Sequence, residues 1–376
     1  MALVSSQCVA AGRILCRVHA EKEVGGRKEF AGSSWSRGGA LGALRLEGCG
    51  REARWGDGGR RLQLGAGAKG RSIVSSALEG KDLGGGGGGA EGLFDKFLDH
   101  AVSAVAQRED VSPLPCQEEF RQMVASDGQS LIKNVAFESE KLRLFRCATI
   151  NGGDNMQVLN VAICARPEYD LPIFCADFFS TPRMNIVVLD LNPLYNTEQR
   201  PDYKEKYFSP LLSMGNKYAE LLPWGDKLTS ESIQFFSPIV LWTRPGSRED
   251  FQETVFSAFK DYLAAWLDMA EKAEPSEDAD EVAENRESHH RYLMWRATKD
   301  PGRYILMRLY GEELCERYIN EFLFNGVNTL GEKEFLDYFP EYRGANGSIV
   351  KQRSVVGKAY EVRPWNKDGI FSPSLI

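Results

Sequence analysis

The stretch MQVLNVAICARPEYDLPIFCADFF, residues 156–179, contains two runs of β-branched, aromatic and other apolar residues separated by the turn-rich segment ARPEYD. Two such runs with a short turn between them predict adjacent antiparallel strands. The polar residues that do not fit the interior of an apolar strand are Asn160 in the first run and Asp177 in the second. We therefore expect these two side chains to face one another across a sheet.

An acid at the end of an otherwise apolar strand, such as Asp177, needs a physical reason. Burial disfavours the charged form of a carboxyl group, so its pKa rises and the group becomes able to donate a proton to a bound substrate. The alternative is a structural Asp177 that caps a turn or pairs with an arginine. Taken alone, the residue favours this structural role, so both roles stay open.

The segment from residue 141 to residue 243 predicts a largely antiparallel meander of strands. Its apolar runs are rich in β-branched and aromatic residues, and turn residues such as NGGDN and STPRMN separate them. The runs are LRLFRCATI (142–150), MQVLNVAIC (156–164), LPIFCADFF (171–179), NIVVLDLN (185–192) and IQFFSPIVLWT (233–243).

Helices are expected to cover this sheet, because several other segments carry an apolar stripe at helical spacing. The expected helices are 93–108, 204–222, 250–273, 280–298 and 305–324. The acidic run EPSEDADE (274–281) is expected to be a solvated connection between two of them. The expected fold is a single α/β domain, a three-layer α/β/α sandwich around a central, largely antiparallel sheet.

The N-terminal part of the chain differs in charge from the rest. Residues 1–75 carry 13 Lys plus Arg and 6 Asp plus Glu, whereas the whole chain has a net charge of −7. A basic, Arg-rich segment that begins MALVSSQCVA predicts a plastid transit peptide over residues 1–75, with a disordered tail or a mitochondrial presequence as alternatives. Residues 76–91 contain six consecutive glycines and predict a flexible linker. The folded domain is then 92–376, and the expected location is the chloroplast stroma.

Several kinds of chemistry lack support in the sequence. No GxGxxG follows a strand, GxxxxGK[ST] and GxSxG do not occur, and the four histidines have no metal-ligand spacing. The five cysteines after residue 75 are widely spaced and include no CxxC pair, so neither a disulfide framework nor an iron–sulfur site is indicated. No apolar run is long enough to span a bilayer. We expect no bound cofactor or metal, and no membrane or nucleic-acid partner.

Seven colinear blocks of the chain resemble the ferredoxin-dependent bilin reductases, which reduce the open-chain tetrapyrrole biliverdin. Blocks spread over roughly 250 residues are a more specific signal than one short motif. Beside residues 156–179, they are IVVLDLNPLY (186–195), KYAELLPWG (217–225), ESIQFFSPIVLWTR (231–244), FSAFKDYLAAWLDM (256–269), NRESHHRYLMWRATKDPGR (285–303) and FLFNGVNTLGEKEFLDYFPEY (322–342). The resemblance implies the same three-layer fold, biliverdin IXα as substrate, no bound redox cofactor, and electrons from reduced ferredoxin of the plant 2Fe–2S type.

The resemblance also implies catalytic roles for Asp177, Asn160 and Asp300. Asp177 matches the family's acid on the central sheet, and Asn160 matches the position that faces it. Asn followed by Asp is the pattern of the reductases that attack the 15,16 methine bridge. The blue-pigment branch has His in the first position, and plant phytochromobilin synthase has Asp first and Asn second. Asp300, in TKDPGR, matches the family's second acid, and its alternative is a helix-end residue before Pro301.

The expected reaction is reduction of biliverdin IXα to 15,16-dihydrobiliverdin by a radical mechanism with Asp177 as the principal proton donor. Radicals follow because small iron–sulfur proteins deliver electrons one at a time, and general acids then supply the protons. The alternatives are four-electron reduction onward to phycourobilin or phycoerythrobilin, phytochromobilin synthesis and, outside the enzymes, a non-catalytic bilin carrier. A downstream bilin reductase is a further expected partner, and the chain is expected to be a monomer.

Other polar residues have less specific candidate roles. His289 and His290 lie on the helix before Asp300, and Arg244 and Lys217 are candidates for binding the bilin propionates. All four have an equally good explanation as packing or surface residues. An acidic ferredoxin should dock on a basic patch. Its candidate residues are Arg183, Lys204, Lys206, Lys217, Arg343 and Lys351.

Overall fold

The computed structural model describes residues 92–114, 120–126, 128–350 and 359–372. The predicted transit peptide (1–75), the predicted linker (76–91) and Lys351 lie outside the described residues. Four cysteines are buried free thiols, namely Cys147, Cys164, Cys175 and Cys315. Within the described ranges, no helix is both long and apolar enough to cross a lipid bilayer.

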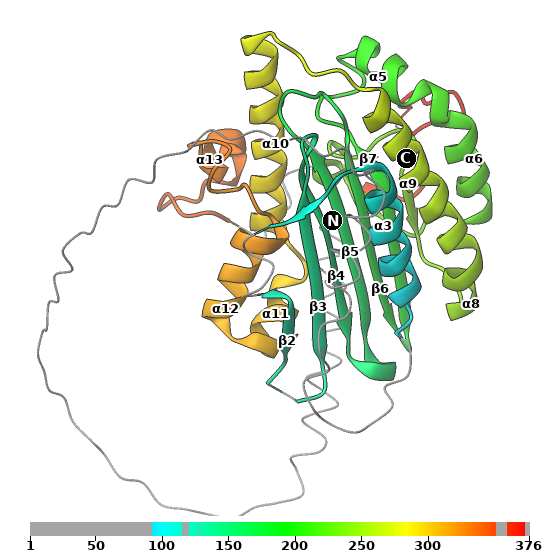
Figure 1. Ribbon diagram of the computed structural model, residues 1–376, viewed down its shortest axis with the longest axis vertical. Helices are drawn as coiled ribbons and strands as arrows, with labels where there is room; N and C mark the ends of the chain where they lie inside the picture. The colour runs from blue at the N-terminus through cyan, green and yellow to red at the C-terminus, as the bar shows by residue number, and fades with distance from the viewer. Residues whose placement is uncertain (1–91, 115–119, 127, 351–358, 373–376) are drawn as a thin grey trace, which may run out of the picture.

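A large antiparallel sheet forms the centre of the fold (Figure 1), with the strand order β1-β3-β4-β5-β6-β7-β9 and with β2 also paired to β3. All its strand pairs are antiparallel. The strands are β1 (Ser112–Pro113), β2 (Gln122–Val124), β3 (Leu131–Glu138), β4 (Leu142–Asn151), β5 (Gln157–Ala165), β6 (Ile173–Thr181), β7 (Met184–Asn192) and β9 (Leu241–Thr243). A separate pair joins β8 (Leu228–Thr229) to β10 (Ala359–Tyr360).

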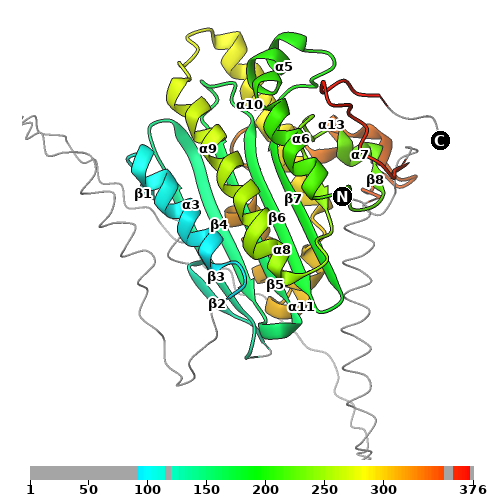
Figure 2. The ribbon, with the colours of Figure 1, turned by 90° about the vertical axis from the view of Figure 1, so that its right-hand side faces the viewer.

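Helices cover both faces of this sheet (Figure 2). One face carries α3 (Asp95–Arg108), α6 (Leu212–Leu221), α8 (Arg248–Asp250) and α9 (Phe256–Lys272), and the other carries α10 (Ala279–Lys299), α11 (Arg303–Tyr310), α12 (Glu312–Arg317) and α13 (Phe335–Tyr338). The remaining helices are α5 (Pro201–Tyr207) and α7 (Ser230–Ile233), with the 3-10 turns η1 (Gly153–Asn155), η2 (Ser209–Leu211) and η5 (Pro340–Tyr342) and the π-helical turns η3 (Phe251–Val255) and η4 (Tyr318–Leu323). The predicted three-layer α/β/α sandwich is confirmed.

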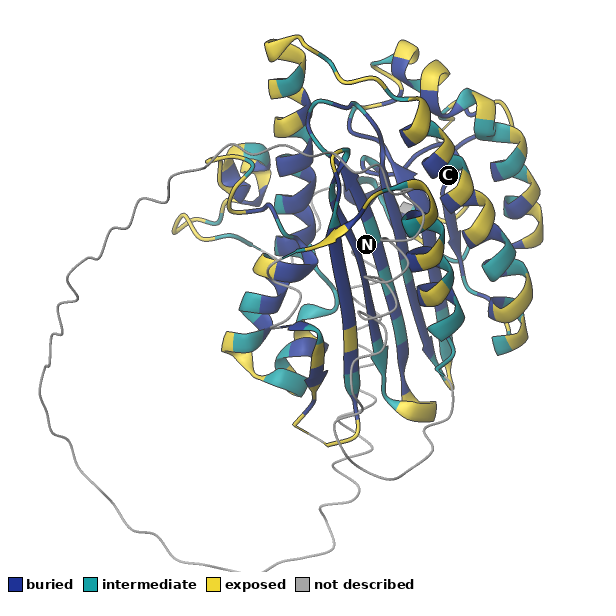
Figure 3. Ribbon diagram, in the orientation of Figure 1, coloured by how far each residue is buried: buried dark blue, intermediate teal, exposed yellow. Residues whose placement is uncertain are grey.

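Aromatic side chains fill the space between the sheet and the α3–α9 layer. Phe97, Phe178 and Phe259 are fully buried, and their rings meet edge to face. Trp266 of α9 is also fully buried, and its indole N–H donates to the carbonyl of Pro172 at 2.7 Å. Figure 3 shows the buried sheet between helices whose outer faces are exposed. This layer therefore packs closely against one face of the sheet, and the cleft described below lies on the opposite face.

Three local expectations were wrong. Residues 233–243 were expected to form one strand, but only β9 is extended, because the backbone N–H of Ser237 turns to the Asp190 carboxylate and Pro238 has no N–H to donate to a sheet. Residues 305–324 were expected to form one helix, but Gly311, with φ +81°, separates α11 from α12. Residues 204–222 divide into α5, η2 and α6 around Pro210.

Candidate active site

A cleft lies between the sheet and the segment that joins α10 to α11. It holds about 770 Å³ of empty space, part of it open to solvent. Most of its lining is apolar, and the sheet side is built by alternate residues of β4 to β7, since every second side chain of a strand points to the same face. The lining residues are Ala148, Ile150, Val158, Asn160, Asp177, Phe179, Ile186, Val188, Asp300, Pro301, Gly302, Ile305, Leu306, Tyr318 and Leu323.

Asn160 and Asp177 occupy directly opposed positions in the β5–β6 pair, as the sequence predicted. Both line the cleft, so the amide and the carboxyl group are neighbours on its sheet side. Arg146 of β4 lies on the same face of the sheet and is buried. Its Nη1 donates to the carbonyl oxygen of Asn160 at 3.3 Å, and its Nε donates to that of Leu323 at 2.6 Å. These bonds fix the backbone on which Asn160 is mounted.

Asp300 lies at the C-terminal end of α10 and lines the same cleft from the opposite side. Its Oδ1 accepts a hydrogen bond from the Gly302 N–H at 3.2 Å, while its buried Oδ2 accepts none from the described residues. Burial raises the pKa of Asp300 to about 6, against the opposing effect of the Arg296 guanidinium. The carboxyl group of Asp300 is thus able to hold a proton close to neutral pH.

Arg296 was not singled out from the sequence, yet it connects the two sides of the site. Its guanidinium is buried, and Nη2 lies 3.4 Å from Oδ2 of Asp177 while Nη1 lies 3.8 Å from Sγ of Cys175. Asp177 therefore has the arginine partner that the sequence left open as an alternative. The only available signal was spacing, since an arginine four residues before Asp300 lies on the same face of the helix.

The two histidines of α10 do not line the cleft. His289 is fully buried, and burial lowers its pKa to about 3. His290 contacts the Tyr338 hydroxyl and the Val327 carbonyl, each at 2.9 Å, through its two ring nitrogens. Both are packing residues of the α10 layer, which is the second of the two explanations that the sequence allowed.

The cationic candidates have acidic neighbours. Lys217 lies 3.6 Å from Asp261, and Arg244 lies 3.1 Å from Asp226. Neither lines the cleft, so the structure does not bring them to Asp177 and Asp300.

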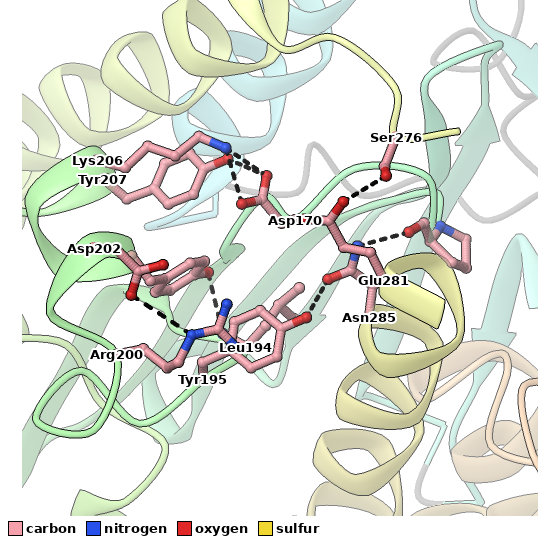
Figure 4. Close-up of polar contacts among 12 residues, drawn as sticks. Asp170, Leu194, Tyr195, Arg200, Asp202, Lys206, Tyr207, Ser276, Glu281 and Asn285 are labelled. Atoms are coloured by element: carbon pink, nitrogen blue, oxygen red, sulfur yellow. Dashed lines mark hydrogen bonds and ion pairs between the residues drawn. The ribbon is translucent and has the colours of Figure 1, made fainter. Parts of the chain in front are cut away.

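Two of the candidate residues for ferredoxin docking also pair with acidic side chains. Lys204 pairs with Glu198 at 3.1 Å and Lys206 with Asp170 at 2.9 Å. Figure 4 shows that Lys206 and Tyr207 of α5 both reach Asp170, in a polar group close to Asn285 of α10. Lys206 joins α5 to the loop before β6, and Lys204 joins it to the segment just before α5, so these two lysines do not form an unpaired basic patch. Arg183 and Arg343 are exposed.

The described ranges contain no group of three or more His, Cys, Asp or Glu side chains placed to hold a metal ion. The polar side chains of the cleft are instead two carboxyl groups, one amide and the Tyr318 hydroxyl, which donates to Oδ1 of Asn134 at 2.7 Å, and the rest of the lining is apolar. Such a site can bind a flat apolar ligand and exchange protons with it.

Comparison with known proteins agrees with the family resemblance of the sequence. The sequence profile described as ferredoxin-dependent bilin reductase matches residues 98–325. The chloroplastic phytochromobilin:ferredoxin oxidoreductase of Arabidopsis thaliana is 45% identical over 278 residues, which are 74% of this chain and 84% of that protein. The 15,16-dihydrobiliverdin:ferredoxin oxidoreductase of Nostoc punctiforme is 29% identical over 241 residues, 63% of this chain and 97% of that protein. The crystal structure of tomato phytochromobilin synthase in complex with biliverdin matches with 50% identity and a TM-score of 0.72, over 74% of this chain and 99% of that one. The chain belongs to the ferredoxin-dependent bilin reductase family.

Proposed function

We propose that this chain reduces biliverdin IXα at the 15,16 methine bridge to 15,16-dihydrobiliverdin, with reduced ferredoxin as the electron donor. Family membership supports the general activity, ferredoxin-dependent reduction of a bilin. The observation that supports reduction at the 15,16 bridge is the opposed pair Asn160 and Asp177 on the cleft face of the sheet. Asn in the first position and Asp in the second is the arrangement expected for methine-bridge reduction.

Reduction of a double bond takes up two electrons and two protons. The electrons arrive one at a time, so a radical forms that must be shielded from water. Asp177 is the proposed donor at the bridge, because it lines the cleft and its side chain is 24% exposed. Asp300 is the proposed second donor, on the other side of the bound bilin. Apolar residues such as Phe179 and Ile305 would hold the tetrapyrrole between them.

Phytochromobilin synthesis is the second candidate, and the overall similarity of the chain favours it. The identities of 45% and 50% are to phytochromobilin-forming enzymes, against 29% to the 15,16-dihydrobiliverdin enzyme. The two indications therefore disagree. We place more weight on the site residues, because proton donors next to the substrate decide which carbon is protonated, whereas overall identity reports the shared fold.

The proposal includes a plastid location and a cleaved leader. A chloroplastic relative and the basic composition of residues 1–75 support it. We propose that the protein acts as a monomer formed by residues 92–376, receives electrons from a 2Fe–2S ferredoxin, and passes its product to a downstream bilin reductase.

Product analysis tests the proposal. The full chain is incubated anaerobically with biliverdin and reduced ferredoxin, and the bilins are separated by chromatography. Accumulation of 15,16-dihydrobiliverdin supports it. Phytochromobilin would establish the second candidate, and phycourobilin or phycoerythrobilin would show four-electron reduction. Biliverdin that is bound but unchanged would identify a non-catalytic carrier.

A further inference from the structure

The guanidinium of Arg296 lies behind the cleft, where hydrogen bonds do not use all of its N–H groups. Only 3% of the residue is exposed, and its Nε is buried without a hydrogen-bond partner among the described residues. Its contact with Asp177 is 3.4 Å long and uses one nitrogen, so it is not the two-pronged pair that arginine forms with a carboxylate at best. A buried, incompletely bonded cation costs stability, so a contribution to packing alone explains it poorly.

Arg296 is linked to both acids, to Asp300 along helix α10 and to Asp177 by a contact between side chains. It is on α10, one helical turn before Asp300, and it reaches across to Asp177 on β6. We propose that Arg296 is a positioning residue that sets the orientation of Asp177 relative to Asp300, so that the two proton donors act in a fixed relation. This inference rests on the proposed function.

Arg296 acts through the acids and does not touch the substrate. It is absent from the lining of the cleft and lines a chamber behind it, whose free volume is about 10 Å³, against about 90 Å³ for the cleft on the same measure. A space of that size holds no pyrrole ring. Asn160 and Leu323 line both spaces and so form the wall between the chamber and the cleft.

The charges around Asp300 define what the loss of Arg296 should do. The cation opposes the rise in the pKa of Asp300 that burial causes, so its removal should raise that pKa further. Asp300 would then keep its proton to higher pH. The groups that face Asp300 are Arg296 of α10, Asp177 of β6, Arg303 of α11, Cys315 of α12 and Tyr318 of η4.

The test compares Arg296→Gln, which removes the charge, with Arg296→Lys, which keeps it. Anaerobic biliverdin consumption by the full chain with reduced ferredoxin is followed over a pH range that spans 6. We expect Arg296→Gln to bind biliverdin but to turn over about tenfold more slowly, because the donors are misplaced. The wild-type rate should fall as the pH rises through about 6, where Asp300 loses its proton. In Arg296→Gln this falling limb of the pH profile should move up by about one pH unit. Arg296→Lys should keep the wild-type limb at a reduced rate.

Two controls separate positioning from a general structural effect. Arg291→Gln removes a partly buried arginine of the same helix that bonds to Gln234 at 2.7 Å, away from the cleft. It should leave the position of the limb unchanged. The double variant Arg296→Gln/Asp300→Asn should have no limb to move.

Wild-type rate and limb in Arg296→Gln would overturn the inference, as would an equal shift in Arg291→Gln. If Arg296→Gln does not fold, Arg296→Lys decides, and a wild-type rate in that variant would also overturn it. Since consumption of biliverdin is measured, a product other than 15,16-dihydrobiliverdin would refute the proposed function and leave the comparison of variants intact.

Discussion

Asn160 and Asp177 are direct register partners in adjacent antiparallel strands, and the same row of the sheet continues to Ala148 on one side and Val188 on the other. The two polar side chains are thus flanked by small or apolar neighbours on the floor of the cleft. A one-residue slip in register would turn the row away from the cleft. The strand pairing that forms the core is therefore also what brings the amide to the acid.

Asp177→Asn should stall the reduction while leaving substrate binding intact. The variant keeps the size and hydrogen-bonding capacity of the side chain but has no transferable proton, and a general acid contributes about a hundredfold or more. We expect biliverdin consumption to fall by about that factor and a bilin radical to accumulate anaerobically. Absorption and electron spin resonance would detect the radical. A variant that forms product at the normal rate would move the donor elsewhere.

Asp300→Asn should remove a pH dependence from turnover. Burial raises the pKa of Asp300 to about 6, so its protonated fraction, and the rate of any step that uses it, falls as the pH rises through that value. The wild type should show this falling limb, and Asp300→Asn should be slower and nearly flat over the same range. Initial rates at saturating ferredoxin would measure it. A limb that persists in the variant would assign it to another group.

The central strands were predictable from the sequence because strongly apolar runs alternate with turns, and so was the facing of Asn160 and Asp177. Strand β3 was not expected, because Lys133 and Asn134 interrupt its apolar pattern. The Asn134 side chain is buried only because it bonds to the Phe120 carbonyl and the Tyr318 hydroxyl, and Tyr318 is 184 residues away along the chain. Partners that distant leave no local pattern.

Arg296 illustrates the same limit at the site. Its sequence neighbours place it on a helix, but its partner Asp177 lies 119 residues earlier. Sequence spacing alone therefore allowed an arginine partner for Asp177 without showing which arginine it is.

Asp190→Ala should destabilise the fold by about 3 kcal/mol, because it leaves buried donors without an acceptor. Asp190 is fully buried on β7, and its Oδ2 accepts from the Ser237 N–H and from Nδ2 of Asn192, each at 2.9 Å. Thermal or denaturant unfolding followed by circular dichroism would measure the loss. A loss below about 1 kcal/mol would show that the donors find other acceptors.

The pH dependence of stability offers a separate test of the same group. Burial raises the pKa of Asp190 to about 6 from 3.8, so between these values the folded chain binds more protons than the unfolded chain. The stability that this group contributes is complete below 3.8 and is lost as the pH rises through about 6. Asp190→Asn, which does not titrate, should flatten that part of the curve relative to the wild type. Identical curves would contradict the assignment.

The exchanged pair Asn160→Asp/Asp177→Asn should change which bond is reduced, and it separates the two candidate functions. The positions are directly opposed, so the exchange moves the acid across the β5–β6 pair and leaves the composition of the cleft unchanged. If the acid's place decides which carbon is protonated, the wild type should yield 15,16-dihydrobiliverdin and the exchanged variant should lose that product. Formation of phytochromobilin by the variant would show that these two residues are sufficient to redirect the reaction. Asn160→Asp alone is the matched control, because it adds the second acid without removing the first, and it should retain the wild-type product. If the exchanged variant and the wild type gave the same product at similar rates, the pair would not determine the site of reduction, and the identity of the chain to phytochromobilin-forming enzymes would become the better guide to its product.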